Sequence, residues 1–316
     1  MSNFLKLMSF VVLMLSVDAW AQSFPNKPIK IIVAFTPGSG SDTQARLYGK
    51  LMEKELGQPV IVENRPGANG LIGLQALKAA PADGYTLGMG GAFLVVNTVM
   101  MKDAQYKVAD FRPISGIVSA PLVLMVGAQS PYKTLNDLLD AAKRENRSIS
   151  IGTYTATYQM GGAWLSQVSG VPVTNVPYKG AAQAITDLSG SHLEAAMADL
   201  GSMKPLLRDG KIRALAISAD KRSADFPNIP LFKEKFPEYE MYVWTALVAR
   251  SETQPDVITR LSAAMQKALA TKESVEYITN SGFNPNQTSP DLMVKYQEDE
   301  YQRYKRIAQD AGIKPE

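Results

Sequence analysis

The residues best suited to hold a ligand lie in a glycine- and serine-rich turn near the amino terminus. An apolar strand is predicted at 29–35, and it runs into Pro37-Gly38-Ser39-Gly40-Ser41, with a helix beginning at about Asp42. The first amides of a helix have no partner within it, and the helix dipole adds about half a positive charge at that end. The turn therefore predicts a binding site for an anion.

Two nucleotide-binding motifs match this turn in part. The phosphate-loop motif needs Gly-Lys followed by Ser or Thr, which the turn lacks. The dinucleotide motif fits better, because Gly38 and Gly40 follow a strand and Glu63 ends the next strand about 20 residues on. Its third glycine position, however, holds Thr43, and export separates the protein from the cytosolic nicotinamide pool.

Asp42 is the residue of this turn that would repel an anion. Aspartate is a preferred N-cap residue, so we expect Asp42 to cap the helix. Because a charged cap would oppose a bound anion, we also expect its side chain to turn away from the ligand.

Further loops that follow predicted strands carry groups able to bind an acid. They are Gly91-Ala92-Phe93 after strand 85–89, Thr153-Tyr154-Thr155-Ala156-Thr157 after strand 148–152, and Tyr178-Lys179 after strand 173–177. The carboxyl ends of parallel strands meet at one edge of a sheet, where α/β proteins bind ligands. We therefore expect these loops and the first turn to meet at one cleft.

Three residues at strand ends leave alternatives open. Lys179 is the only cation in these loops, and it either pairs with an acidic ligand or is a solvated surface lysine. Thr157 either donates to a carboxylate or caps a helix. Asp199 follows strand 193–198, and it either binds an ammonium group or caps the helix at 202–208, which the cap preference favours.

The elements that position these loops alternate as in an α/β protein. Residues 29–89 are predicted as strand, helix, strand, helix and strand. The pattern restarts near residue 134, where Thr134 and Asp137 form a capping box, and it continues through strand 212–218. Such alternation predicts two units, each a doubly wound sheet of parallel strands.

Two apolar segments, 122–126 and 244–248, are predicted to cross between these units. The helices predicted after them, at about 256–270, 273–280 and 290–311, have apolar faces that need the first sheet. We therefore predict that lobe 1 comprises residues 22–122 plus 247–316 and that lobe 2 comprises 123–246. Two crossing strands form a hinge, and hinged lobes enclose ligands in the cleft between them.

The first residues of the chain are typical of a secretory signal peptide. Lys6 precedes an apolar stretch from Leu7 to Val17, and Ala19-Trp20-Ala21 matches a cleavage site. The stretch is too short to span a bilayer, which needs about 20 apolar residues. We predict a signal peptide at 1–21, cleavage after Ala21, and a periplasmic product.

The composition argues against several kinds of chemistry. The 316 residues include no cysteine and one histidine, His192, and the formal net charge is +3 without a basic block. Thiol chemistry, zinc binding, Ser-His-Asp catalysis and nucleic-acid binding are therefore poorly supported. We expect a binding protein rather than an enzyme, with no metal and no cofactor, and we expect His192 to lie in a surface turn.

Several motifs together resemble the periplasmic solute receptors of the tripartite tricarboxylate transporter family, also called Bug or TctC-like receptors. The resemblance runs in order over the whole chain after the signal peptide. Its specific runs are Glu63-Asn64-Arg65-Pro66-Gly67 and Val176-Pro177-Tyr178-Lys179-Gly180. Further matching runs lie at 24–29, 37–42, 80–87 and 210–216.

This resemblance implies a two-lobed, type II periplasmic-binding-protein fold, or Venus flytrap, that captures a small organic carboxylate without chemistry. It implies that backbone amides of 37–42 hold the carboxylate, often with ordered waters that bridge to both lobes. The loops at 91–93 and 153–157 would supply the other contacts. It also implies delivery to the membrane permease subunits of a tripartite tricarboxylate-type transporter, and we expect a monomer.

The chain departs from the family pattern at two loops. Ser39 and Ser41 replace a glycine and a threonine of the first turn, and Tyr154 and Ala156 replace glycines of the lobe-2 loop. A tyrosine there predicts a reshaped pocket that takes a planar or aromatic carboxylate. The rings predicted to pack near it are Phe93, Tyr154 and Tyr158.

Two other functions are compatible with these residues. A sensor that presents its ligand to a membrane signalling protein would use the same site, and only gene neighbourhood or uptake by a deletion strain separates the two. An enzyme on this scaffold would need a base and a nucleophile, which a single histidine supplies poorly. Mono-, di- and tricarboxylates, aromatic acids and amino acids all fit an amide-lined site.

Overall fold

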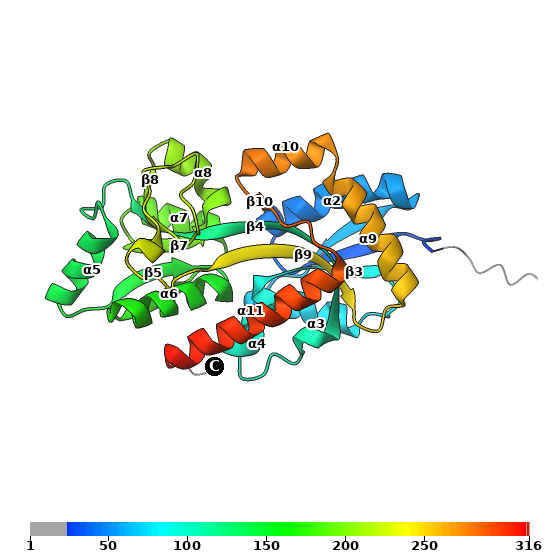
Figure 1. The fold of residues 1–316 in the computed structure, drawn as a ribbon, viewed down its shortest axis with the longest axis horizontal. Coiled ribbons are helices and arrows are strands. Elements are labelled where there is room, and N and C mark those ends of the chain that lie inside the picture. Colours follow the sequence, from blue (N-terminus) through cyan, green and yellow to red (C-terminus); the bar gives the residue numbers. More distant parts are fainter. Residues whose placement is uncertain (1–23, 314, 316) are drawn as a thin grey trace, which may run out of the picture.

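The chain folds into two α/β lobes joined by long strands (Figure 1). The computed structural model describes residues 24–313 and residue 315. One sheet of strand order β2-β1-β3-β9-β4-β7-β5-β6 runs through both lobes, and β8 and β10 pair with β4 off this path. The predicted signal peptide and its cleavage after Ala21 lie outside the described residues.

Lobe 1 is built on parallel strands with helices between them. β1 (Ile29–Val33) pairs in parallel with β2 (Val60–Asn64) and with β3 (Thr86–Gly91). Its helices are α2 (Gly40–Leu56), the 3₁₀ turn η1 (Ala68–Gly70), α3 (Leu71–Ala79), α4 (Ala92–Met100) and the 3₁₀ turn η2 (Val108–Asp110). The parallel pairing confirms the predicted α/β alternation.

Lobe 2 repeats this construction. β5 (Ile149–Thr153) pairs in parallel with β6 (Val173–Pro177) and with β7 (Ala195–Asp199). Its other elements are α5 (Leu135–Arg144), α6 (Ala156–Ser169), α7 (Ala181–Ser189), α8 (Leu200–Arg208), β8 (Ile212–Ile217) and the 3₁₀ turn η3 (Phe232–Glu234). Thr134 and Asp137 form the predicted capping box before α5.

Two antiparallel strands, β4 (Phe111–Gly127) and β9 (Tyr242–Arg250), connect the lobes, and Figure 1 shows both crossing the middle of the molecule. β4 pairs with β9 as far as Pro121 and with β7 and β8 from Leu122 onward. The predicted crossing segments 122–126 and 244–248 lie within these two strands. The change of partner on β4 lies between Pro121 and Leu122, and the predicted division into 22–122 plus 247–316 and 123–246 remains a proposal.

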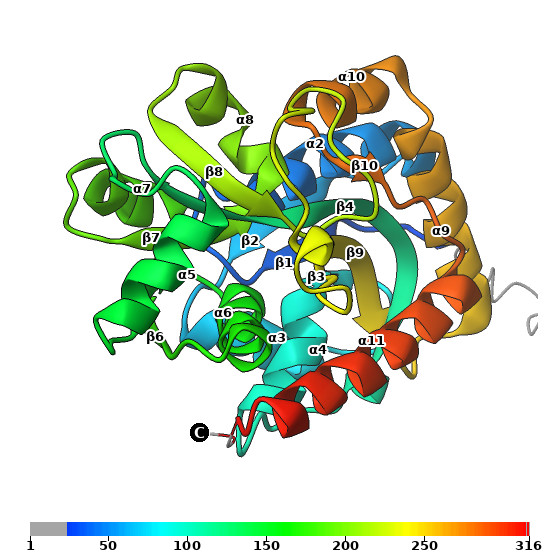
Figure 2. The ribbon, with the colours of Figure 1, turned by 60° about the vertical axis from the view of Figure 1, so that its left-hand side comes forward.

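The helices after β9 are α9 (Pro255–Leu269), α10 (Lys272–Ser281) and α11 (Pro290–Asp310), and the short β10 (Asn284–Pro285) lies between the last two. α9 covers the lobe-1 sheet, because its Leu261 and Met265 share a core with Ile31 of β1 and Leu87 of β3. α11 was predicted on the same sheet, but it also packs against α6 of lobe 2 (Figure 2). At 1.5 Å per residue, α11 is about 30 Å long, which lets it reach both lobes.

The apolar core has three parts. One cluster lies within lobe 1 and one within lobe 2. The third joins the lobes beside the crossing strands, since it contains Leu94 of α4 and Tyr304 of α11 together with Leu165 of α6. A shared core of this kind holds the hinge region together while each lobe keeps a core of its own.

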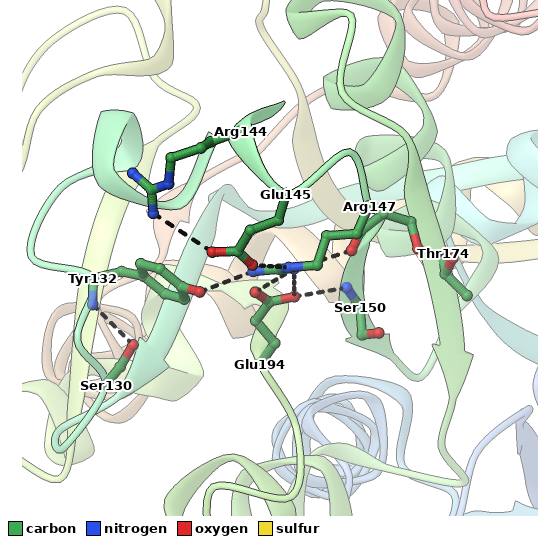
Figure 3. A network of polar contacts seen from close by, with 9 residues as sticks. Ser130, Tyr132, Arg144, Glu145, Arg147, Ser150, Thr174 and Glu194 are labelled. Atoms are coloured by element: carbon green, nitrogen blue, oxygen red, sulfur yellow. Dashed lines mark hydrogen bonds and ion pairs between the residues drawn. The ribbon is translucent and has the colours of Figure 1, made fainter. Parts of the chain in front are cut away.

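A polar network fastens lobe 2 at the amino-terminal end of β5 (Figure 3). Arg147 donates to Glu145 at 2.7 Å, to the Tyr132 hydroxyl at 2.9 Å and to Glu194 at 3.1 Å. Glu194 also accepts the backbone N–H of Ser150 at 3.1 Å. The hydrogen bond from Arg147 lowers the pKa of the Glu145 carboxyl. This end of β5 is opposite the loop that begins at Tyr154, so the network stiffens the lobe away from the candidate site.

Candidate functional site

A cavity of about 680 Å³ lies between the two lobes. Its lobe-1 wall comes from the residues that follow β1 and β3, and its lobe-2 wall comes from those that follow β5, β6 and β7. Strand β9 forms the floor through Val243, Trp244 and Thr245. The cavity thus lies where the carboxyl ends of the parallel strands of both lobes face one another.

The structure brings most of the predicted site residues together around this cavity. They are Pro37, Gly38, Ser39, Gly40, Ser41, Ala92, Phe93, Tyr154, Thr155, Thr157, Lys179 and Asp199. The predicted residues Asp42, Gly91, Thr153 and Tyr178 are not part of its lining.

Three of these four residues have other structural roles. Thr153 donates its hydroxyl to Asn175, and Tyr178 donates its hydroxyl to Asp187 at 2.8 Å. Gly91 lies where β3 approaches β9 closely, because a Cβ there would be 2.5 Å from the carbonyl oxygen of Trp244. Only glycine fits that approach without a shift of one strand.

Asp42 does not cap α2, which corrects the sequence prediction. The cap is Ser39, whose Oγ accepts the N–H of Asp42 at 3.2 Å, so the helix begins at Gly40. The buried Asp42 carboxylate instead accepts from the N–H of Gly38 at 2.9 Å, from Arg46 at 2.9 and 3.0 Å, and from Asn64 at 2.9 Å. Burial raises the pKa of Asp42, but these hydrogen bonds outweigh it and the pKa is lowered. Asp42 is absent from the cavity lining, which is compatible with the prediction that its side chain turns away from the ligand.

The start of α2 presents backbone donors to the cavity. Because Ser39 satisfies the third amide of the helix, the N–H groups of Gly40 and Ser41 are left, and they have no acceptor among the residues that the structure describes. Both residues line the cavity. A carboxylate placed there would receive two N–H donors together with the favourable field of the helix dipole.

Three further helices begin at the cavity without a side-chain cap. α4 begins after Gly91, α6 after Thr155 and α7 after Gly180, and none of these residues accepts an N–H of its helix through a side chain. Residues from the first turn of each helix line the cavity. Together with α2, four helix amino termini from both lobes direct partial positive charge into one cavity.

α8 is different, because Asp199 caps it. Oδ1 of Asp199 accepts the N–H of Ser202 at 2.7 Å, which is the helix-cap role that the sequence favoured. Oδ2 accepts the hydroxyl of Tyr158 at 3.2 Å. Thr157 lies inside α6 and does not cap it. Lys179 is exposed and lines the cavity, which is compatible with either of its predicted roles.

Aromatic rings form much of the remaining wall. The rings of Phe35 and Phe93 pack edge to face with centroids 4.9 Å apart, and those of Tyr154 and Tyr158 lie 4.6 Å apart. Among these rings Thr155 carries a buried Oγ1 that has no hydrogen-bond partner in the described part of the chain. The site therefore offers anion-binding amides and an apolar surface for the body of a ligand.

Similarity to known proteins identifies the family. Residues 44–313 match the model of the tripartite tricarboxylate transporter family receptor. The chain belongs to this family. One relative of this receptor is protein BugT of Bordetella pertussis, which is 32% identical over 302 residues, 93% of this chain and 92% of the relative.

Solved structures give the same result for the fold of the receptor. The periplasmic binding protein BugD has a TM-score of 0.85 at 25% identity, covering 93% of this chain and all of that one. Rpa4515 of R. palustris, solved with adipate, has a TM-score of 0.86 at 29% identity, covering 93% of this chain and 100% of that one. MatC from Rhodopseudomonas palustris, with bound malate, has a TM-score of 0.83 at 26% identity, covering 90% of this chain and 99% of that one. The receptor thus has the two-lobed periplasmic-binding-protein fold.

The sequence did not predict the floor of the receptor cavity. Trp244 and Thr245 were assigned only to a crossing strand, and Phe283 follows α10 far along the chain. A strand that crosses at a hinge must pass beneath the cleft. The assignment of 244–248 to a crossing strand could therefore have predicted that these residues form the floor. Tyr158, whose ring was predicted to pack near the ligand, is part of the lining. The other lining residues that the sequence prediction omitted are Phe35, Thr36, Gln44, Gly180, Ala181, Ala182, Ile185, Ser202, Met203, Leu206 and Val243.

Within residues 24–313 and 315, no group of three or more His, Asp or Glu side chains is placed to hold a metal ion. No helix of that part is both long and apolar enough to cross a membrane. His192 is exposed in the turn between α7 and β7, as predicted.

Proposed function

We propose that this receptor captures a small organic carboxylate in the cavity between its lobes and delivers it to the membrane permease subunits of a tripartite tricarboxylate-type transporter. One observation carries the proposal: α2, α4, α6 and α7 all begin at that cavity, and the last three lack a side-chain cap. The adipate and malate bound by two similar proteins support a carboxylate as the ligand.

The carboxylate would lie at the start of α2. The N–H groups of Gly40 and Ser41 donate to it, and each hydrogen bond to a charged group contributes about 1.5–3 kcal/mol. The hydroxyl of Thr155, on the opposite wall, is a further donor. Lys179 adds a positive charge from the outer part of the lobe-2 wall. No residue in this arrangement needs to form or break a covalent bond.

Closure of the two lobes would trap the ligand. A ligand that contacts both lobes favours the closed arrangement by its extra affinity for it. The strands that must flex are β4 and β9, where Leu122 N–H donates to the carbonyl of Met241 at 3.3 Å beside the change of partner on β4. We propose that the permease subunits recognise the closed form.

We also propose that the receptor works in the periplasm as a monomer, after cleavage behind Ala21 removes residues 1–21. The family and the signal-peptide pattern of the first residues support this location. Each lobe has its own core, and both walls of the cavity come from one chain, so a second copy is not needed to complete the site.

A thermal-shift screen of residues 22–316 tests carboxylate capture. The panel pairs mono-, di- and tricarboxylates, aromatic acids and amino acids with their neutral amides. A ligand at 100 times its Kd stabilises the protein by about 2.7 kcal/mol, which is a clear shift in Tm. We expect at least one acid to raise Tm while its amide does not. Equal shifts with an acid and its amide would contradict the proposal.

Delivery to a permease needs its own test. A strain that lacks the receptor gene should lose uptake of the acid identified by the screen and regain it with the gene restored. Mass spectrometry of the denatured, freshly purified protein complements the screen, since a co-purified acid would mask any shift. If no acid shifts Tm and no acid is released, the receptor does not capture carboxylates.

A further inference from the structure

Two tyrosines and an aspartate form a hydrogen-bonded chain on the lobe-2 wall of the cavity. The hydroxyl of Tyr154 donates to the hydroxyl of Tyr158 at 3.3 Å, which donates to Oδ2 of Asp199 at 3.2 Å. All three residues line the cavity. Tyr158 and Asp199 are nearly buried, with exposed fractions of 4% and 6%.

Asp199 sets the direction of this chain. A carboxylate accepts hydrogen bonds and donates none, and its other oxygen already accepts the N–H of Ser202. Both phenolic protons therefore point toward Asp199. The oxygen of Tyr154 is left with lone pairs, so the side chains of this hydrogen-bonded chain present acceptors to a ligand and no donors.

The charge of Asp199 is not neutralised by the groups that bond to it. Its hydrogen-bond partners in the described residues, Ser202, Tyr158 and Tyr154, are all neutral. Burial, with the nearby charge of Asp199 as a further cause, raises the pKa of both Tyr154 and Tyr158, so their hydroxyls stay protonated. A second anionic group beside this chain would be repelled by the Asp199 carboxylate, which pairs with no cationic side chain among the described residues.

The order of the strands distributes charge unevenly along the lobe-2 wall of the cavity. β7 lies next to β4 at the hinge, whereas β6 is the outer strand of lobe 2. Asp199 ends β7 and Lys179 follows β6, so the negative charge lies near the hinge and the positive charge lies toward the outer edge. A ligand with one carboxylate would place it at the start of α2 and turn its other end toward Asp199.

The cavity has room for a ligand that reaches from one end to the other. Its volume of about 680 Å³ far exceeds that of a carboxylate, and the rings of Phe93, Trp244 and Phe283 line the space. An aliphatic or aromatic body between the two polar ends would pack against these rings.

We infer that the ligand of this receptor is a monocarboxylate with a hydroxyl or amino group at its far end, which donates to the Tyr154–Tyr158–Asp199 chain. The inference rests on the proposed carboxylate capture and adds the chemistry of the second end. A dicarboxylate places an acceptor where the wall offers acceptors, so it binds more weakly than the matched hydroxy acid.

Calorimetric titration with two matched series tests the inference. One series is hexanoate, 6-hydroxyhexanoate and adipate, and the other is benzoate, 4-hydroxybenzoate and terephthalate. In each series that binds, we expect the hydroxy acid to bind about 10-fold more tightly than the other two, as one added hydrogen bond gives.

The variant Asp199→Asn should reverse the direction of the hydrogen bonds in the Tyr154–Tyr158–Asp199 chain. Asparagine still caps α8, because its oxygen accepts the N–H of Ser202, while its NH₂ group donates to Tyr158. The tyrosine protons are then free to point into the cavity, so the preference should shift from the hydroxy acid to the diacid. Asp140→Asn is the matched control, since it makes the same charge change on the exposed surface of α5.

The outcomes of these titrations test the chemistry of the second end of the ligand independently of carboxylate capture. Loss of the hydroxy-acid preference in Asp199→Asn, with the preference intact in Asp140→Asn, supports it. Tightest binding of the diacid or the plain acid by the wild type overturns it, as does an unchanged preference in Asp199→Asn, and carboxylate capture stands in each case. If neither series binds, the inference is wrong, and the wider thermal screen decides whether carboxylate capture is wrong too.

Discussion

The hydroxyl of Ser39 accepts the N–H of Asp42 at 3.2 Å, and this single bond orients the candidate anion site. It starts α2 at Gly40 and leaves the Asp42 carboxylate free to pair with Arg46 behind the turn. The amides of Gly40 and Ser41 then face the cavity, while the Asp42 carboxylate is held by Arg46 and Asn64 outside the cavity lining. A capped helix and an open anion site are thus combined in one turn.

Ser39→Asp should abolish most of the binding without unfolding the protein. Aspartate is as good an N-cap as serine, so the helix start is kept. Its charge would lie about 5 Å from the bound carboxylate, where repulsion of about 3 kcal/mol corresponds to a loss of affinity on the order of 100-fold. Ser39→Asn keeps the cap without the charge and should bind like the wild type. Equal affinity of the aspartate and asparagine variants, measured by calorimetry, would show that the anion does not lie at this turn.

Thr155→Val should weaken binding while leaving stability unchanged or raised. The buried Oγ1 of Thr155 has no partner in the described residues, and an unsatisfied buried hydroxyl costs free energy in the folded state. If it donates to the ligand, its removal costs about 10-fold in Kd. Urea unfolding and calorimetry of the same preparation separate the two effects. A large loss of stability with unchanged Kd would indicate a structural role instead.

Gly91→Ala should destabilise the fold and thereby the cavity. The new Cβ would lie 2.5 Å from the Trp244 carbonyl oxygen, so β3 and β9 would have to move apart. Such overpacking costs about 1–3 kcal/mol. Gly180→Ala is the control, because a Cβ there meets nothing within 4 Å. Urea unfolding midpoints that fall equally for both variants would contradict this reading of Gly91.

The elements predicted well are those specified by local sequence. The strand–helix alternation, the capping box at Thr134 and most of the loops at 37–42 and 153–157, apart from Asp42 and Thr153, depend on residues a few positions apart. The cap of α2 was predicted wrongly because Ser39 and Asp42 are both good N-cap residues, and the choice depends on Arg46 and Asn64, which hold the Asp42 carboxylate.

The cavity floor and the path of α11 depend on contacts between distant segments. Trp244 and Phe283 reach the cavity only because β9 pairs with both β3 and β4 and because the segment after α10 returns to β4. No local pattern reports such pairing. The hydrogen-bonded chain from Tyr154 to Asp199 likewise joins residues of two helix starts that only the sheet order brings together.

Asp42 should contribute to the acid sensitivity of the fold. Its pKa is lowered in the folded protein, so the native state binds fewer protons there than the unfolded state does. The stabilisation is fully present above the unfolded value of about 3.9 and is lost as the pH falls through the lower folded value. The difference in unfolding free energy between the wild type and Asp42→Asn should therefore be larger at pH 7 than at pH 3. The same difference at both pH values would rule out this contribution.

Calorimetric titration of residues 22–316 with the acid that gives the largest thermal shift, and with its neutral amide, tests the central claim most directly. Carboxylate capture by helix amino termini predicts that the acid binds and that the amide, which lacks the negative charge, binds at least about 100-fold more weakly, since it loses charge-assisted hydrogen bonds. Comparable affinities for the acid and the amide would contradict the claim that the cavity is an anion site.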